Sequence, residues 1–145
     1  MSGEESRRLD RMRHTGVDHF DLVVSDLDRS LAFYRGLLEP LGYVRASEIV
    51  GEQGERVVYV GGPEVVPFSL RAARTPGPYD RYRIGVHHVA FQAPSRDVVD
   101  ERLHWAREQG MEIENDPKEY DYTPGYYAGF FFDPDGIKLE IVNRP

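Results

Sequence analysis

The fold is decided by residues 17–24, which read Val17-Asp18-His19-Phe20-Asp21-Leu22-Val23-Val24. Apolar and polar side chains alternate through this stretch, which is typical of a strand that buries one face. Asp26 follows as a favourable helix N-cap, and apolar residues at helical spacing continue from Leu27 to Leu38. Pro40 and Gly42 then end the helix. These residues predict a half-buried strand that leads directly into an amphipathic helix.

The same order of elements is repeated in the second half of the chain. A strand pattern covers residues 85–93, Ser95 caps a second helix, and Gly110 ends it. Asp133-Pro134-Asp135-Gly136 is a strong turn signal before the last strand. Further short strands are expected at residues 43–49, 56–60, 65–72, 111–113, 126–132 and 137–142. We therefore predict one domain over residues 15–145, built from modules at about 15–74 and 84–143, behind a flexible arm at 1–14.

Composition restricts the possible functions. The chain has 145 residues and no cysteine, which excludes disulfides, thiolate zinc sites and a cysteine nucleophile. The net charge of −7, with no basic stripe, argues against nucleic acid as a partner. No apolar run is long enough to cross a membrane, and the first residues do not resemble a secretory signal. We therefore expect a cytoplasmic protein.

Strand alternation places a set of polar residues on one face of the predicted sheets. That set comprises His19, Asp21, Ser69, Arg71, His88, Gln92, Lys138 and Glu140. Such a face is either washed by water or wrapped around a polar site. His19 and His88 occupy matching positions in the two modules, and two imidazoles with the Glu140 carboxylate form a donor set for a metal with open coordination positions. His87 is expected on the helix side, in a structural role.

Four segments in this order carry a family resemblance: residues 17–19, 26–34, 85–91 and 133–140. Together they resemble the vicinal oxygen chelate superfamily, also called the glyoxalase/bleomycin resistance/dioxygenase family, over residues 17–142. The resemblance implies an α+β fold, in which two βαβββ modules form an open mixed β-barrel around a metal, with the helices on the outside. It also implies His19, His88 and Glu140 as metal ligands and a homodimer.

Ser69 departs from the pattern of family members that have four protein ligands. Typical glyoxalase I, which this family resemblance includes among the members with four protein ligands, has glutamate or glutamine at this position, and serine is a poor ligand for a divalent ion. The resemblance therefore favours three protein ligands, with water or substrate completing the coordination of one divalent ion (Fe2+, Mn2+, Zn2+, Ni2+ or Co2+). It implies a metal-dependent enzyme of dioxygenase or lyase/isomerase type that acts on a small, metal-chelating oxygenated substrate, with no other cofactor. The alternative is a metal-free drug- or metabolite-binding protein of the bleomycin-resistance type.

Three further residues are candidates for the chemistry. Asp21 would act as a general base or orient a ligand, and Arg71 would hold an anionic group of the substrate. The alternative is that these two side chains pair with each other or with solvent. Tyr127 belongs to a tyrosine-rich segment, with Tyr120, Tyr122 and Tyr126, that would form an aromatic wall or donate a hydrogen bond. The alternative for these tyrosines is strand propensity and core packing.

Overall fold

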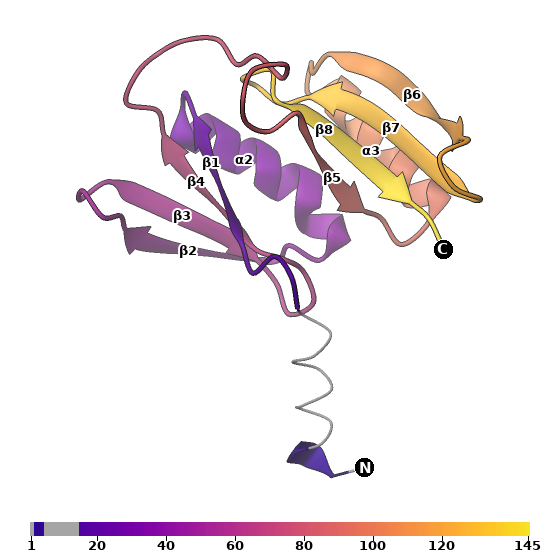
Figure 1. The fold of residues 1–145 in the computed structure, drawn as a ribbon, viewed down its shortest axis with the longest axis horizontal. Coiled ribbons are helices and arrows are strands. Elements are labelled where there is room, and N and C mark those ends of the chain that lie inside the picture. The colour runs from indigo at the N-terminus through magenta and orange to yellow at the C-terminus, as the bar shows by residue number, and fades with distance from the viewer. Residues whose placement is uncertain (1, 5–14) are drawn as a thin grey trace.

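The computed structural model describes residues 2–4 and 15–145, and two four-stranded mixed sheets organise the longer stretch (Figure 1). The first sheet has the order β1-β4-β3-β2. Its strands are β1 (Phe20–Val24), β2 (Arg45–Val50), β3 (Arg56–Gly61) and β4 (Phe68–Ala72). β1 runs parallel to β4, and the other pairs are antiparallel. The first strand of this sheet is therefore an edge strand.

The second sheet repeats this topology with the order β5-β8-β7-β6. Its strands are β5 (His88–Gln92), β6 (Ile113–Tyr120), β7 (Tyr126–Phe132) and β8 (Lys138–Asn143). β5 runs parallel to β8, and β8, β7 and β6 pair antiparallel. The two sheets do not close on each other, which confirms the predicted α+β fold with an open, barrel-like arrangement.

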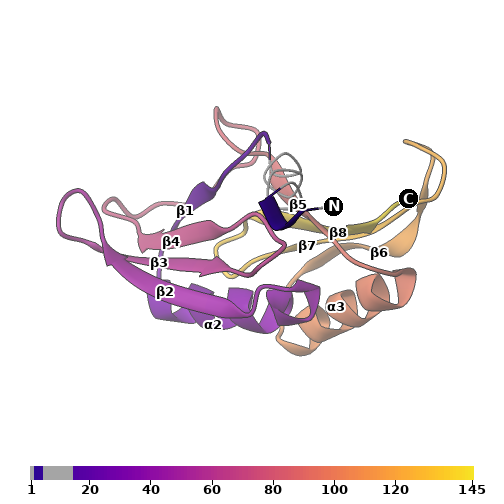
Figure 2. The ribbon, with the colours of Figure 1, turned by 90° about the horizontal axis from the view of Figure 1, so that it is seen from below.

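Both long helices lie on the same side of the two sheets, as Figure 2 shows. Helix α2 (Leu27–Leu38) is capped by the Asp26 side chain and continues into the 3-10 helix η1 (Glu39–Leu41). Helix α3 (Arg96–Glu108) is capped by Ser95. Neither helix is long and apolar enough to cross a membrane, and the same holds for the rest of the described chain.

One hydrophobic core joins the two modules. Phe68 of the first sheet and Phe91 of the second have ring centroids 6.0 Å apart, and Tyr43 contacts Phe91 edge-on at 5.8 Å. Arg102 of α3 is buried and donates to the carbonyl oxygen of Gly36 at the end of α2, at 2.9 Å. The two helices and the two sheets therefore share one core.

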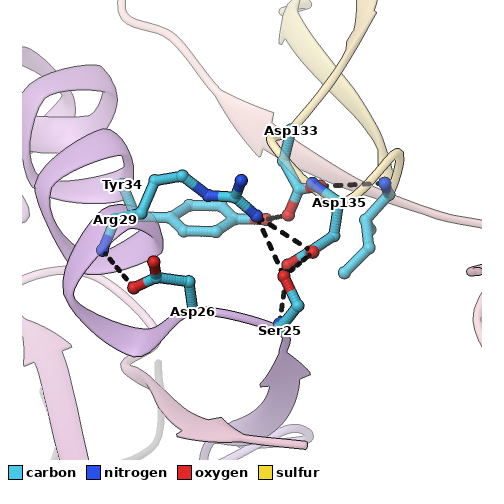
Figure 3. Close-up of polar contacts among 7 residues, drawn as sticks. Ser25, Asp26, Arg29, Tyr34, Asp133 and Asp135 are labelled. Carbon is cyan, nitrogen blue, oxygen red and sulfur yellow. Dashed lines mark hydrogen bonds and ion pairs between the residues drawn. The ribbon is translucent and has the colours of Figure 1, made fainter. Parts of the chain in front are cut away.

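A polar contact also links the modules, at the turn before β8 (Figure 3). Asp133 accepts a hydrogen bond of 2.6 Å from the Tyr34 hydroxyl of α2, and both side chains are buried. Asp135 accepts from the backbone N–H of Ser25 at 3.0 Å and from the Ser25 hydroxyl. Arg29 donates to Ser25 Oγ at 2.9 Å. The predicted Asp-Pro-Asp-Gly turn is thus fixed to the first module.

One predicted strand is longer in the structure than expected, and one predicted segment lies mostly outside the described residues. Strand β6 spans eight residues, where the sequence pattern predicted only residues 111–113. The longer strand contains Pro117, which has no backbone N–H. β6 is an edge strand and its register shifts between Asn115 and Lys118, so the missing donor is accommodated. The predicted arm at 1–14 falls mainly on residues 1 and 5–14, which lie outside the described residues.

Candidate functional site

His88 and Glu140 meet on the uncovered face of the second sheet. His88 begins β5, Glu140 lies in the middle of the neighbouring strand β8, and His88 Nε2 is 3.1 Å from Glu140 Oε1. Glu140 is only 2% exposed, whereas His88 is partly accessible. Strand alternation predicted that these side chains would share a face, and the structure brings them into contact.

Aromatic side chains surround this pair. The Tyr126 hydroxyl donates to Glu140 Oε2. The rings of Tyr120 and Tyr122 are stacked, with centroids 5.2 Å apart. All three tyrosines line a hollow of about 370 Å³ together with His88 and Glu140. Burial and the hydrogen bond to Glu140 raise the pKa of Tyr126, which keeps its hydroxyl protonated as a donor.

His87 lies in this hollow and not on the helix side, where the sequence pattern had placed it. It precedes the first residue of β5, so strict strand alternation does not extend to it. Its Nδ1 is 2.8 Å from His88 Nδ1, so one of these two nitrogens carries a proton. Desolvation, followed by the neighbouring His88, lowers the pKa of His87. Where His88 donates this hydrogen bond, its Nε2 is left with a lone pair that faces Glu140.

The charged rim of this hollow is internally balanced. Glu114 is paired with Arg81 at 2.5 Å and with Lys138 at 3.1 Å. Burial opposes ionisation of Glu114, but the hydrogen bonds from these two cations outweigh it and lower the Glu114 pKa. Lys138 also lies over the Phe130 ring at 4.7 Å. The two cations are therefore committed to neighbouring groups.

His19 occupies the matching place in the first module. It directly precedes β1, and its ring centroid is 5.6 Å from that of Tyr59, much as His88 lies 6.2 Å from Phe130. Its Nδ1 contacts Asp18 Oδ1 at 2.7 Å, and this hydrogen bond raises the pKa of His19. A carboxylate that accepts a hydrogen bond from Nδ1 fixes the tautomer of the imidazole and leaves Nε2 with a lone pair that can bind a metal.

Asp21, Ser69 and Arg71 form a contact network beside His19. The Ser69 hydroxyl donates to Asp21 Oδ1, and Arg71 Nη2 is 3.8 Å from the same oxygen. Arg71 Nη1 is also 3.3 Å from Glu55. The pairing of Asp21 with Arg71, which was the alternative to their roles in the chemistry, is therefore present, and two carboxylates share the Arg71 charge.

The structure does not bring all the predicted site residues together. No set of three His, Asp or Glu side chains suited to one metal ion gathers within residues 2–4 and 15–145, so His19 does not join His88 and Glu140 in a single chain. Tyr127 turns away from the hollow: its hydroxyl donates to Asp100 of α3 at 2.6 Å, a bond that raises its pKa to about 12. Tyr126, its neighbour, is the tyrosine that faces Glu140. Alternation along β7 could have separated these two residues.

The donor set fits a divalent ion. Two ligands bound at about 2.1 Å and at right angles are about 3 Å apart, which matches the 3.1 Å between His88 Nε2 and Glu140 Oε1. Imidazole nitrogen and carboxylate oxygen suit iron, manganese, cobalt, nickel and zinc. His19 offers a third donor of the same kind from the other module.

A family profile, a relative in sequence and several solved structures match this chain. The Glyoxalase/Bleomycin resistance protein/Dioxygenase superfamily profile matches residues 16–141. The uncharacterized protein YqjT of Bacillus subtilis is 32% identical over 130 residues, covering 87% of this chain and 97% of its own. A glyoxylase/bleomycin resistance protein/dioxygenase domain from Frankia sp. EAN1pec is 25% identical, with a TM-score of 0.73 over 90% of this chain and 93% of that one. The fosfomycin resistance protein FosX of Listeria monocytogenes, 20% identical, shares the fold with a TM-score of 0.63 over 90% of this chain and 94% of its own.

Proposed function

The chain belongs to the Glyoxalase/Bleomycin resistance protein/Dioxygenase superfamily, and on that premise we propose that it is a metal-dependent enzyme acting on a small oxygenated substrate. The proposed ligands are His19, His88 and Glu140. The proposed reaction is of dioxygenase or lyase/isomerase type, with the substrate chelating one divalent ion. A divalent ion at this position would stabilise negative charge on a substrate oxygen and lower the pKa of the groups bound to it.

The contact between His88 and Glu140 carries this proposal. A histidine nitrogen and a carboxylate oxygen face each other at 3.1 Å, and the carboxylate is almost fully buried. Both facing atoms can offer a lone pair to a metal, so a cation bound between them would be coordinated by nitrogen and oxygen. The open hollow beside them leaves space for a substrate of small size.

We propose that a second copy of the chain completes the site with its own His19. Within one chain His19 is apart from His88 and Glu140. β1 and β5 are edge strands, and exposed apolar residues flank or occupy them: Val17, Val23, Ile84 and Val86. Unpaired edges with apolar flanks favour association. A twofold dimer that brings β1 of one protomer towards β5 of its partner would form two such sites.

The tyrosines have separate proposed roles around the substrate. Tyr126 holds Glu140 Oε2, so that Oε1 remains directed towards His88. The Tyr120 hydroxyl is buried and has no hydrogen-bond partner among the described residues, so it is available to donate to a substrate oxygen. Arg71 is balanced by two carboxylates, which favours a role in orienting Asp21 over direct binding of an anion.

Metal analysis tests the proposal directly. Protein purified without chelator is expected to contain one divalent ion per chain, measured by inductively coupled plasma mass spectrometry. The His88→Ala variant should lose this metal while retaining its secondary structure. His104→Ala is the matched control, because His104 is exposed on α3 and pairs with its helix neighbour Glu108. Absence of bound metal in the wild type, combined with tight binding of an aromatic drug, would establish the binding-protein alternative instead.

A further inference from the structure

Strand register aligns the first module's polar residues in one row. Asp21 of β1 is directly opposite Ser69 of β4, and Ser69 is directly opposite Tyr59 of β3. His19 lies at the end of this row, next to the Tyr59 ring. The row therefore consists of Asp21 on β1, Ser69 on β4 and Tyr59 on β3, and His19 lies beside it.

The second module contains the equivalent row with one difference. Ala90 of β5 is opposite Glu140 of β8, and Glu140 is opposite Phe130 of β7. His88 lies next to the Phe130 ring. Here the small residue is on the first strand and the carboxylate is on the last. In the first module the carboxylate is on the first strand and the small residue is on the last.

Compared with the second module, the carboxylate of the first module is on the neighbouring strand but in the same row. Adjacent strands are about 4.8 Å apart, a distance that side chains on neighbouring positions readily bridge, and the Ser69 hydroxyl does contact Asp21. Asp21 is in the same row as Tyr59, and the Tyr59 ring lies next to the His19 imidazole, so His19 and Asp21 lie at the same row of the sheet. A histidine and a carboxylate therefore accompany each other in both modules.

We propose that Asp21 is the first module's counterpart of Glu140 and binds the metal ion as a fourth protein ligand. Each module then contributes one imidazole and one carboxylate. Because Asp21 has this role only where His19, His88 and Glu140 hold an ion, the assignment rests on the proposed function. Serine at position 69 is then a positioning residue that holds the carboxylate from the neighbouring strand.

The contacts of Asp21 suit a ligand. Its Oδ1 accepts a hydrogen bond from the Ser69 hydroxyl and forms an ion pair with Arg71. No described residue forms a hydrogen bond or ion pair with its Oδ2. The Asp21 side chain is 41% exposed, so an ion from solvent can reach the carboxylate. A ligating carboxylate is commonly held through one oxygen by neighbouring donors while the other binds the metal. Ser69 and Arg71 supply those donors here.

Moving the carboxylate back to β4 tests the assignment. The Asp21→Ala variant should bind Co2+ at least about tenfold more weakly than the wild type in calorimetric titration. The Asp21→Ala/Ser69→Glu double variant copies the alanine and glutamate of the second module and should regain most of the lost affinity. The cobalt absorption spectrum should change in the single variant and return towards the wild-type form in the double variant.

Two further variants separate ligation from folding and charge. Asp21→Asn keeps an acceptor for Ser69 and should preserve the melting temperature of the metal-free protein, yet it should still weaken Co2+ binding. Asp28→Asn, an exposed change of the same charge on α2, should bind Co2+ like the wild type. Normal Co2+ affinity in Asp21→Ala and Asp21→Asn overturns the assignment, as does a double variant that folds but stays weak. If the wild type itself binds no Co2+, the proposed function fails as well, and the two failures are therefore distinguishable.

Discussion

Tyr34 donates a 2.6 Å hydrogen bond to Asp133, a residue 99 positions further along the chain. Burial, which removes both groups from water, is the main reason that the pKa values of Tyr34 and Asp133 are raised. The other oxygen of Asp133 accepts from the backbone N–H groups of Asp135 and Ile137, at 2.8 and 2.9 Å. A buried carboxylate with three donors is thus the point at which the turn before β8 meets helix α2.

Removing the hydroxyl of Tyr34 should destabilise the protein. In Tyr34→Phe, Asp133 Oδ2 stays buried without its donor, and we expect the free energy of unfolding to fall by about 1–3 kcal/mol. Urea denaturation measures this loss. Tyr82→Phe is the control, because Tyr82 is 76% exposed, and it should change stability by less than about 0.5 kcal/mol. Equal stability of the two variants would contradict the role assigned to the Tyr34 hydroxyl.

Adding a methyl group at Gly36 should force the two helices apart. A Cβ there would lie 2.5 Å from Cζ2 of Trp105, so Gly36→Ala should lower the free energy of unfolding by about 1–3 kcal/mol. Replacing the indole by Leu removes the obstacle. In a Trp105→Leu background the same alanine should therefore cost markedly less. A double-mutant cycle by urea denaturation measures the coupling, and strictly additive effects would refute the steric explanation.

Tyr43 should make stability depend on alkaline pH. Burial raises its pKa from 10.0 to about 12, so its contribution is fully present below about pH 10 and is lost as the pH rises towards 12. Between pH 9 and 11, the wild type should therefore lose about 1 kcal/mol more than Tyr43→Phe, which has no group to titrate. Denaturation midpoints at the two pH values provide the measurement. Parallel losses in both proteins would show that Tyr43 keeps its ordinary pKa.

Tyr126 and Tyr127 offer a matched pair for the role of the hydroxyl next to Glu140. Tyr126→Phe should weaken metal binding by about 10- to 100-fold, because Glu140 loses the donor that orients it. Tyr127→Phe removes a hydroxyl from the opposite face, where it contacts Asp100, and should leave metal affinity unchanged. Calorimetric titration with Zn2+ distinguishes the two. Similar affinities in both variants would exclude a positioning role for Tyr126.

Mixing two defective variants tests whether the site is shared between protomers. His19→Ala and His88→Ala should each lack bound metal. After co-refolding at equal amounts, half of the dimers pair one variant with the other, and each contains one intact site, so metal content should recover to about a quarter of the wild-type value. Light scattering verifies the dimer. No recovery in a mixture shown to be dimeric would place the whole site within one chain.

Local signals in the sequence predicted most of the fold. Asp26 and Ser95 cap their helices as expected, and Gly42 and Gly110 adopt the positive φ angles that end them. Alternation along β5 and β8 correctly brought His88 and Glu140 to one face. It could not locate His19 relative to them, because alternation specifies a face of one sheet and not the distance between two sheets. It also missed Asp21 as a counterpart of Glu140, since pairing between strands is not visible in a single strand.

The contact at the turn before β8 has a consequence for how the repeated halves unfold. Ser25, Arg29 and Tyr34 belong to the first half, and Asp133 and Asp135 belong to the second. Neither half can satisfy these buried and charged groups alone, and the aromatic core around Phe68 and Phe91 is shared in the same way. We therefore expect the two halves to lose their structure in one cooperative transition. Although the sequence reads as a repeat, the unit that folds is the whole chain from β1 to β8.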